Sequence, residues 1–208
     1  VLTSYKPGTW NQYAKRAVES VIKFWPEDTQ IAVYHEAQAQ DVFEHSRIEW
    51  YDAHEVQPEL LKFKQRHKDD PVANGELQEI PGGVRRPEAL KKKGGLDKNK
   101  GSFLWNAVRF SNKVFCVTHA LKNSKGYDYV IWLDADTYTF RPMPKSFLES
   151  LLPVDTMLTY LGRENPNLKD GGKYPECGFV GYNMNNPEIQ NYCACLLYTS
   201  DAADDLLC

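Results

Sequence analysis

The chain has 208 residues, and its 25 lysines and arginines against 28 aspartates and glutamates give a formal net charge of −3. Hydrophobic residues make up 42% and charged residues 25%, which is the composition of a globular domain and argues against a disordered chain. The sequence has no apolar run long enough to cross a bilayer, and its near-neutral charge gives no case for nucleic-acid binding.

The first part of the chain alternates predicted strands and helices. A long amphipathic helix is predicted from Thr9, its N-cap, to Pro26, with Gln12 completing a capping box. The other elements predicted here are strands over residues 1–5, 30–35 and 47–51 and a short helix over residues 58–67. This order is typical of a parallel sheet with covering helices.

Periodicity vanishes over residues 69–101, where glycine, proline and lysine dominate. We expect a flexible functional loop or insertion there. Order returns with a helix from Ser102 to about Gly126 and a fully apolar strand over residues 129–133. The last predicted elements are a helix over residues 146–152, strands over 156–161 and 178–182, and a helix that Pro187 opens.

Both ends of the chain have unusual features. The chain opens on Val1 with neither an initiating methionine nor a signal-like segment, so we expect that its true N-terminus is missing. Residues 195–208 resemble the translation of a sequencing adapter, which would make Asp204 and Asp205 uninformative. The prediction is therefore a single α/β domain over residues 1–194 with a non-native tail.

Without the tail, the cysteines form no predicted disulfide framework or zinc site. The three that remain are Cys116, Cys177 and Cys193. An odd number without close pairing favours a reducing compartment, and we expect a cytoplasmic location.

Two aspartates follow the most apolar predicted strand, in the run Asp134-Ala135-Asp136. Such a strand delivers its last residues to the carboxyl edge of a parallel sheet, where ligands bind in open α/β folds. Two carboxylates one residue apart can converge on a hard cation, Mg²⁺ or Mn²⁺, which keeps positions open for phosphate. The alternative is a turn with two solvated acids, but a turn does not need the apolar run before it. The sequence predicts that Asp134 and Asp136 bind a metal.

Residues 130–137, VIWLDADT, resemble the DxD motif of GT-A-fold glycosyltransferases. In that family a metal holds the diphosphate of a nucleotide sugar. The Arg141-Pro142 pair and the helix after it look like the same family's continuation. Lys113 and the three residues after it resemble a lysine-bearing helix of the glycogenin-like, family-8-like enzymes, and residues 176–183 resemble the strand that carries their sugar-binding Asn-x-Gly turn. The ordered match covers about residues 103–183, with weaker support from residues 1–36.

This resemblance implies a GT-A fold, a Mn²⁺ or Mg²⁺ cofactor, a nucleotide-sugar donor such as a UDP-sugar, and a carbohydrate or other hydroxyl acceptor. Two departures limit what it implies. Glu176-Cys177-Gly178 stands where the family has Asn-x-Gly. The resemblance therefore implies neither the identity of the sugar nor the stereochemical course of the reaction. The family's late histidine, often a third metal ligand, would lie beyond Ala194.

Several further residues are candidates for the site. A cation held by Asp134 and Asp136 would stabilise the charge on a leaving diphosphate. Glu176 would activate the acceptor or orient the sugar, unless it is an ordinary loop acid. Arg109 and Lys113 lie one helical turn apart and would supplement the charge on the donor, or they form a solvated helix edge. The remaining donor-binding candidates are Thr3, Ser4 and Tyr5, at the end of the first strand near the base and ribose, and Gly178.

Two other functions remain open. In haloacid-dehalogenase-like phosphatases an Asp-x-Asp run also follows a buried strand, but there Thr or Val stands four residues after the first aspartate, where this chain has Tyr138. The second alternative is a catalytically inactive remnant that binds nucleotide sugars without turnover.

Overall fold

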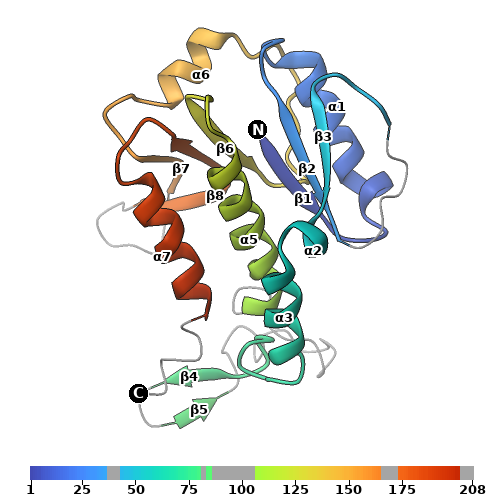
Figure 1. Ribbon diagram of the computed structural model, residues 1–208, viewed down its shortest axis with the longest axis vertical. Coiled ribbons are helices and arrows are strands. Elements are labelled where there is room, and N and C mark those ends of the chain that lie inside the picture. The colour runs from blue at the N-terminus through green and yellow to red at the C-terminus, as the bar shows by residue number, and fades with distance from the viewer. Residues whose placement is uncertain (37–42, 81–82, 86–105, 165–172, 202–208) are drawn as a thin grey trace.

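The computed structural model describes residues 1–36, 43–80, 83–85, 106–164 and 173–201. Its centre is a six-stranded sheet with the order β3-β2-β1-β6-β8-β7 (Figure 1). The strands are β1 (Leu2–Tyr5), β2 (Ile31–His35), β3 (Ile48–Asp52), β6 (Tyr129–Leu133), β7 (Leu158–Glu164) and β8 (Lys173–Asn183). The first four are parallel, whereas β8 is antiparallel to both of its neighbours, β6 and β7. The predicted α/β class with a mostly parallel sheet is confirmed.

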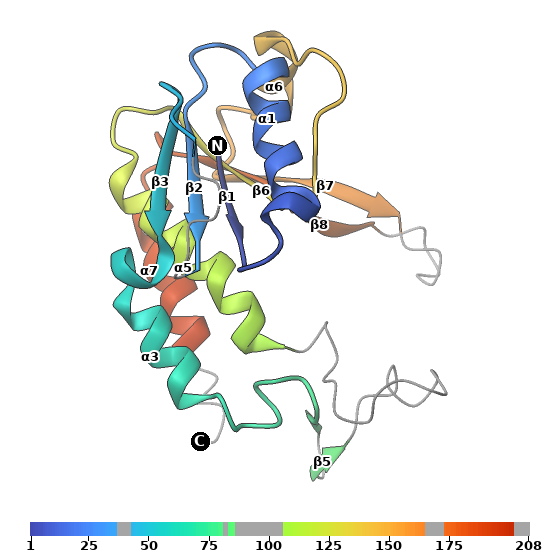
Figure 2. The ribbon, with the colours of Figure 1, turned by 90° about the vertical axis from the view of Figure 1, so that its right-hand side faces the viewer.

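Helices cover both faces of this sheet. One face carries α1 (Lys15–Phe24) and α6 (Lys145–Leu151), and the other carries α2 (Ala53–Val56), α3 (Pro58–Arg66), α5 (Ala107–Asn123) and α7 (Ile189–Asp201). Figure 2 shows α1 on one side of the sheet and α3, α5 and α7 on the other. Each face has its own apolar core, so the central strands are buried on both sides, as their continuous apolar runs predict. None of the helices in the described ranges is both long and apolar enough to cross a membrane.

The first helix begins differently from the prediction. Its opening turn, η1 (Trp10–Ala14), is a π-helix, and the Thr9 side chain caps no amide. The Thr9 hydroxyl instead donates to the carbonyl oxygen of Lys6 at 2.7 Å, so the predicted capping box with Gln12 is wrong. The wider turn accompanies burial of Trp10, which is 1% exposed and packs against Tyr5 with ring centroids 5.1 Å apart.

The segment predicted to be a flexible loop contains regular structure. β4 (Gln78–Ile80) and β5 (Gly83–Arg85) form an antiparallel two-stranded sheet in the lower part of Figure 1. Before it, the Asp70 side chain accepts a hydrogen bond from the amide of Val72 at 2.8 Å, which stabilises a turn. The expectation of an irregular loop is therefore wrong for these stretches, and residues 86–101 lie outside the described ones.

Two helix ends also differ from the prediction. α5 starts at Ala107, with the Asn106 side chain accepting from the amide of Arg109, whereas residues 102–105 lie outside the described ones. α7 continues past residue 194 to Asp201, and Leu196 and Leu197 pack against the core under α5. Residue 194 lies inside this helix, and the domain end there stays a prediction. Asp204 and Asp205 are outside the described residues.

Candidate active site at the carboxyl edge of β6

The buried strand β6 ends at Leu133, and Asp134 follows at the carboxyl edge of the sheet. The chain turns at once, because the amide of Thr137 donates to the carbonyl oxygen of Asp134 at 2.8 Å. Within this turn Ala135 is buried, the Asp134 side chain is 42% exposed, and Asp136 is exposed. Both predicted metal ligands are therefore accessible at the edge of the sheet.

One oxygen of the Asp134 carboxylate is held by two donors. The indole Nε1 of Trp132 donates to Oδ1 at 2.6 Å, and the ammonium of Lys113 donates to the same oxygen at 3.3 Å. Lys113 also donates to the carbonyl oxygen of Cys177 and lies 4.8 Å from the centre of the Trp132 ring. The contacts of Oδ1 give Asp134 a defined orientation that a solvated turn acid would not have.

The antiparallel strand β8 brings a second segment to this edge. Its backbone joins β6 where the amide of Asp134 donates to the carbonyl oxygen of Gly178 at 2.9 Å. On its other side, β8 has an irregular register with β7, because Val180 pairs with Tyr160 but Glu176 pairs with Leu161. Residues 177–179 therefore bulge from the ladder with β7, and bulges of this kind commonly reorient residues beside active sites.

Gly178 leaves a small space lined by oxygen atoms. A Cβ at this position would lie 3.5 Å from Asp134 Oδ2, 3.5 Å from Glu176 Oε1 and 3.8 Å from Thr137 Oγ1. Carboxylate and hydroxyl oxygens are the ligands that Mg²⁺ and Mn²⁺ prefer. In the described ranges no three His, Cys, Asp or Glu side chains gather as a metal cluster. Magnesium, however, commonly binds through one or two carboxylates and substrate phosphates, so the donor chemistry of Asp134 and Asp136 fits such an ion.

The Glu176 carboxylate is already engaged. It forms an ion pair with Arg163 on β7, and its Oε1 accepts a hydrogen bond from the amide of Gly178 at 3.3 Å. Its side chain is 28% exposed, so it remains accessible from solvent. These contacts orient Glu176, and its Oε1 lies at the same space next to Gly178 as Asp134 Oδ2. The choice between a role in the site and an ordinary loop acid stays a prediction.

The structure separates the two basic candidates on α5. Lys113 reaches Asp134, as described above, whereas Arg109 is exposed one helical turn closer to the start of α5. The helix thus contributes one ammonium group to the edge of β6. A spacing of four residues puts both side chains on one face of α5, and the contact with Asp134 places Lys113 at the edge of β6.

The three candidates on β1 do not share one face. Thr3 and Tyr5 are buried toward α1, Tyr5 against Trp10 and Thr3 beside a small cavity next to Val18. Ser4 points to the opposite face, where its hydroxyl interacts with the thiol of Cys116 on α5. This alternation follows from the two-residue period of a strand. It puts Ser4 on the side of Lys113, whereas the small cavity beside Thr3 is also lined by Asp134 and Thr137.

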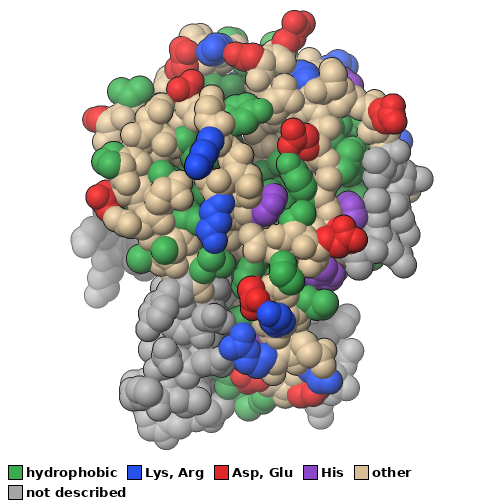
Figure 3. Space-filling model, viewed as in Figure 1, with side chains coloured by type: hydrophobic (Ala, Val, Ile, Leu, Met, Phe, Trp, Pro, Cys, Tyr) green, Lys and Arg blue, Asp and Glu red, His purple; other side chains and the backbone are tan. Residues whose placement is uncertain are grey.

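A second polar cluster lies at the carboxyl edge of β2 and β3, and the sequence analysis missed it. Lys64 donates to Glu36 at 2.8 Å and contacts His54 Nε2 at 3.3 Å. His35 lies 3.9 Å from Asp52, whose side chain caps α2. Histidine side chains are exposed on the face shown in Figure 3. The order of the elements in the chain could have indicated this cluster, because neighbouring parallel strands end at the same edge of a sheet.

Trp132 and Arg163 are the other contributors that the sequence analysis did not select. Trp132 lies two residues before Asp134, so the two-residue period of a strand places both side chains on one face. That spacing could have identified it. Arg163 had no such signal, because its contact with Glu176 depends on the register between β7 and β8.

Comparison with known proteins supports the fold. No protein-family model and no curated protein sequence matches the chain. Among solved structures, mouse xyloside xylosyltransferase 1 in its apo form matches with a TM-score of 0.50 and 12% sequence identity, over 96% of this chain and 74% of that chain. The chain has a GT-A-like fold. Within this GT-A-like fold, Asp134 occupies the carboxyl edge of the central sheet, where α/β folds bind their ligands.

Proposed function

We propose that the protein is a metal-dependent glycosyltransferase that moves a sugar from a nucleotide-diphosphate donor, a UDP-sugar, to a hydroxyl acceptor. The observation that carries this proposal is the orientation of Asp134. Its Oδ1 is held by Trp132 and Lys113, while its Oδ2 faces the oxygen-lined space at Gly178. The similarity to a xyloside xylosyltransferase supports the proposal at the level of the fold.

In this reaction the leaving group is a nucleoside diphosphate, on which negative charge grows as the glycosidic bond lengthens. Asp134 and Asp136 would hold Mn²⁺ or Mg²⁺, which when bound supplies Lewis-acid stabilisation of that charge. Lys113 supplies a positive charge at the same edge of the sheet, and fixed charges in a closed site stabilise a transition state strongly. Glu176 would accept a hydrogen bond from a sugar or acceptor hydroxyl, with its ion pair to Arg163 holding the carboxylate in place.

Isothermal titration calorimetry tests the metal role. We expect UDP to bind more tightly with Mn²⁺ than with a chelator present, and Asp136→Ala to remove the difference. Asp155→Ala is the matched control, because Asp155 is an exposed acid on a loop between α6 and β7. Equal UDP affinities with and without metal would refute the role of the cation. Mn²⁺-dependent hydrolysis of a UDP-sugar, lost in Asp136→Ala, tests the transferase chemistry.

A second candidate function, nucleotide-sugar binding without turnover, is favoured by one observation. Both carboxylates nearest Gly178 already have counter-ions, because Asp134 pairs with Lys113 and Glu176 pairs with Arg163. Such paired groups can bind a ligand and still be poor at assisting bond cleavage. Metal-dependent UDP binding with no donor hydrolysis would support this function over the transferase.

A further inference from the structure

We propose that Trp132 is a positioning residue of this site, whose indole N–H fixes the Asp134 carboxylate so that Oδ2 is the oxygen offered to a cation. The inference rests on the proposed function. It adds a role for a core side chain that belongs to neither the DxD run nor the predicted donor-binding residues.

The first argument is the rigidity of Trp132. The side chain is 3% exposed and belongs to the core between β6 and α5, where it packs with residues such as Phe115 and Val117. A buried indole N–H without an acceptor would cost about 1–3 kcal/mol, and Asp134 Oδ1 at 2.6 Å is the acceptor that the structure provides. The hydrogen bond therefore ties a partly exposed carboxylate to a side chain that cannot reorient.

The second argument is that the two oxygens of Asp134 have different partners. Lys113 donates to Oδ1 as well, and its ammonium is held over the indole ring at 4.8 Å from the ring centre. Trp132 thus contacts both the carboxylate and its counter-ion. Oδ2, in contrast, lies 3.5 Å from the point where a Cβ of residue 178 would stand. Outer partners that orient a ligand in this way typically change metal affinity by about 10–100-fold when removed.

Trp25 provides a matched control within the same chain. Its indole Nε1 donates to the Thr139 hydroxyl at 2.8 Å, and its side chain is 4% exposed. Trp25 follows the end of α1, on the opposite face of the sheet from Trp132. Replacing either tryptophan by phenylalanine removes one buried indole hydrogen bond and a similar volume, but only one of them contacts Asp134.

The experiment measures the affinity for Mn²⁺ in the presence of UDP for the wild type, Trp132→Phe and Trp25→Phe. We expect Trp132→Phe to weaken Mn²⁺ binding about tenfold or more. Trp25→Phe should bind like the wild type while losing comparable thermal stability. If Trp132→Phe does not fold, benzothienylalanine at position 132 replaces the N–H by sulfur, keeps the ring shape, and should show the same weakening.

A spectroscopic readout is independent of turnover. In ¹H–¹⁵N spectra of the protein without metal, Asp134→Asn should move the indole resonance of Trp132 upfield and leave that of Trp25 in place, because a carboxylate is the stronger acceptor. An unmoved Trp132 resonance, or equal Mn²⁺ affinity in the wild type and in the variants at position 132, would overturn the positioning role alone. A wild type that shows no metal-dependent UDP binding would overturn the proposed function together with it.

Discussion

The amide of Asp134 donates to the carbonyl oxygen of Gly178 at 2.9 Å. This hydrogen bond extends the pairing between β6, the last of the parallel strands, and the antiparallel strand β8. Because β8 runs opposite to β6, its residues before the junction lie beyond the carboxyl edge of β6. The bulge at residues 177–179 then turns Glu176 and the Cys177 carbonyl toward Asp134 and Lys113. Two segments far apart in the sequence form one site in this way.

Substitution of Gly178 by alanine should reduce ligand binding without destabilising the fold. The added Cβ would make ordinary contacts of 3.5 Å with Asp134 Oδ2 and Glu176 Oε1, and nothing in the backbone at Gly178 requires glycine. The methyl group would, however, fill the space between these oxygens. We expect the free energy of unfolding to change by less than about 1 kcal/mol, and the affinity for Mn²⁺ and UDP in calorimetry to fall severalfold.

Gly181→Ala is the control on the same strand and should behave in the opposite way. A Cβ there would collide with the Leu152 side chain and approach Thr159 Oγ1 to 2.6 Å. Leu152 is buried, so we expect overpacking to cost about 1–3 kcal/mol of unfolding free energy while ligand affinity is retained. If Gly178→Ala destabilised the fold as much as Gly181→Ala, the space at Gly178 would have a structural role instead of a binding role.

His119 should make stability depend on pH. Burial is the main cause that lowers its pKa from the usual 6.5, and nearby Lys122 lowers it further. The ring nitrogen Nδ1 forms a hydrogen bond with the Tyr34 hydroxyl, at 2.8 Å. A group whose folded pKa is lower than its unfolded pKa binds fewer protons in the folded state. Its contribution to stability is therefore complete above the unfolded pKa and is lost as the pH falls below about 6.5 toward the folded value.

Urea unfolding of the wild type and of His119→Gln, from about pH 8 down to about pH 5, measures this contribution. Glutamine keeps a hydrogen-bonding group near Tyr34 but does not titrate. The difference in unfolding free energy between the two proteins should shrink as the pH falls. A difference that stays constant over this range would contradict the assignment to His119.

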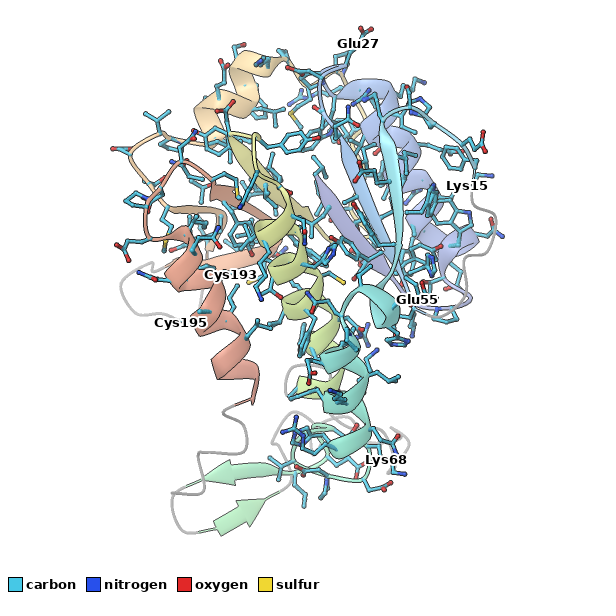
Figure 4. All side chains as sticks on the ribbon, viewed as in Figure 1. Lys15, Glu27, Glu55, Lys68, Cys193 and Cys195 are labelled. Carbon is cyan, nitrogen blue, oxygen red and sulfur yellow. The ribbon has the colours of Figure 1, made fainter. Side chains whose placement is uncertain are left out.

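The cysteines should differ sharply in their reaction with N-ethylmaleimide. Cys116 and Cys193 are buried, and burial raises the pKa of both thiols, whereas Cys177 and Cys195 are exposed. Figure 4 shows Cys193 and Cys195 on the same helix, α7. Because the thiolate is the reactive form, peptide mass spectrometry should find fast labelling of the exposed pair and labelling of the buried pair only in denaturant. Early labelling of Cys116 would contradict its burial.

Deletion of residues 195–208 should lower the thermal midpoint. Although these residues resemble an adapter translation, Leu196 and Leu197 contact the core next to α5. Both are partly buried, so their loss should cost about 1–3 kcal/mol in total, given about 1.5–3 kcal/mol for a fully buried leucine. The double variant Leu196→Ser, Leu197→Ser should reproduce most of this loss in calorimetry. An unchanged midpoint in both would show that these contacts contribute nothing.

Much of the fold was predictable because it depends on local patterns. The apolar run of β6 indicated a strand buried on both faces, and its end located Asp134 at the carboxyl edge of the sheet. The amphipathic spacing of α5 put Lys113 on a helix next to that strand in the chain. Periodicity and composition carry this information within a window of about ten to eighteen residues, so a single sequence is enough to recover it.

The contacts that make the site specific depend on pairings over long distances. The antiparallel direction of β8, its bulge at residues 177–179 and the ion pair of Arg163 with Glu176 all follow from strand register, which a local pattern does not encode. The contact of Lys113 with Asp134 likewise depends on where α5 crosses the sheet. The sequence indicates which side chains could bind a cation or a phosphate. The packing of the strands and helices decides which of them lie next to Asp134.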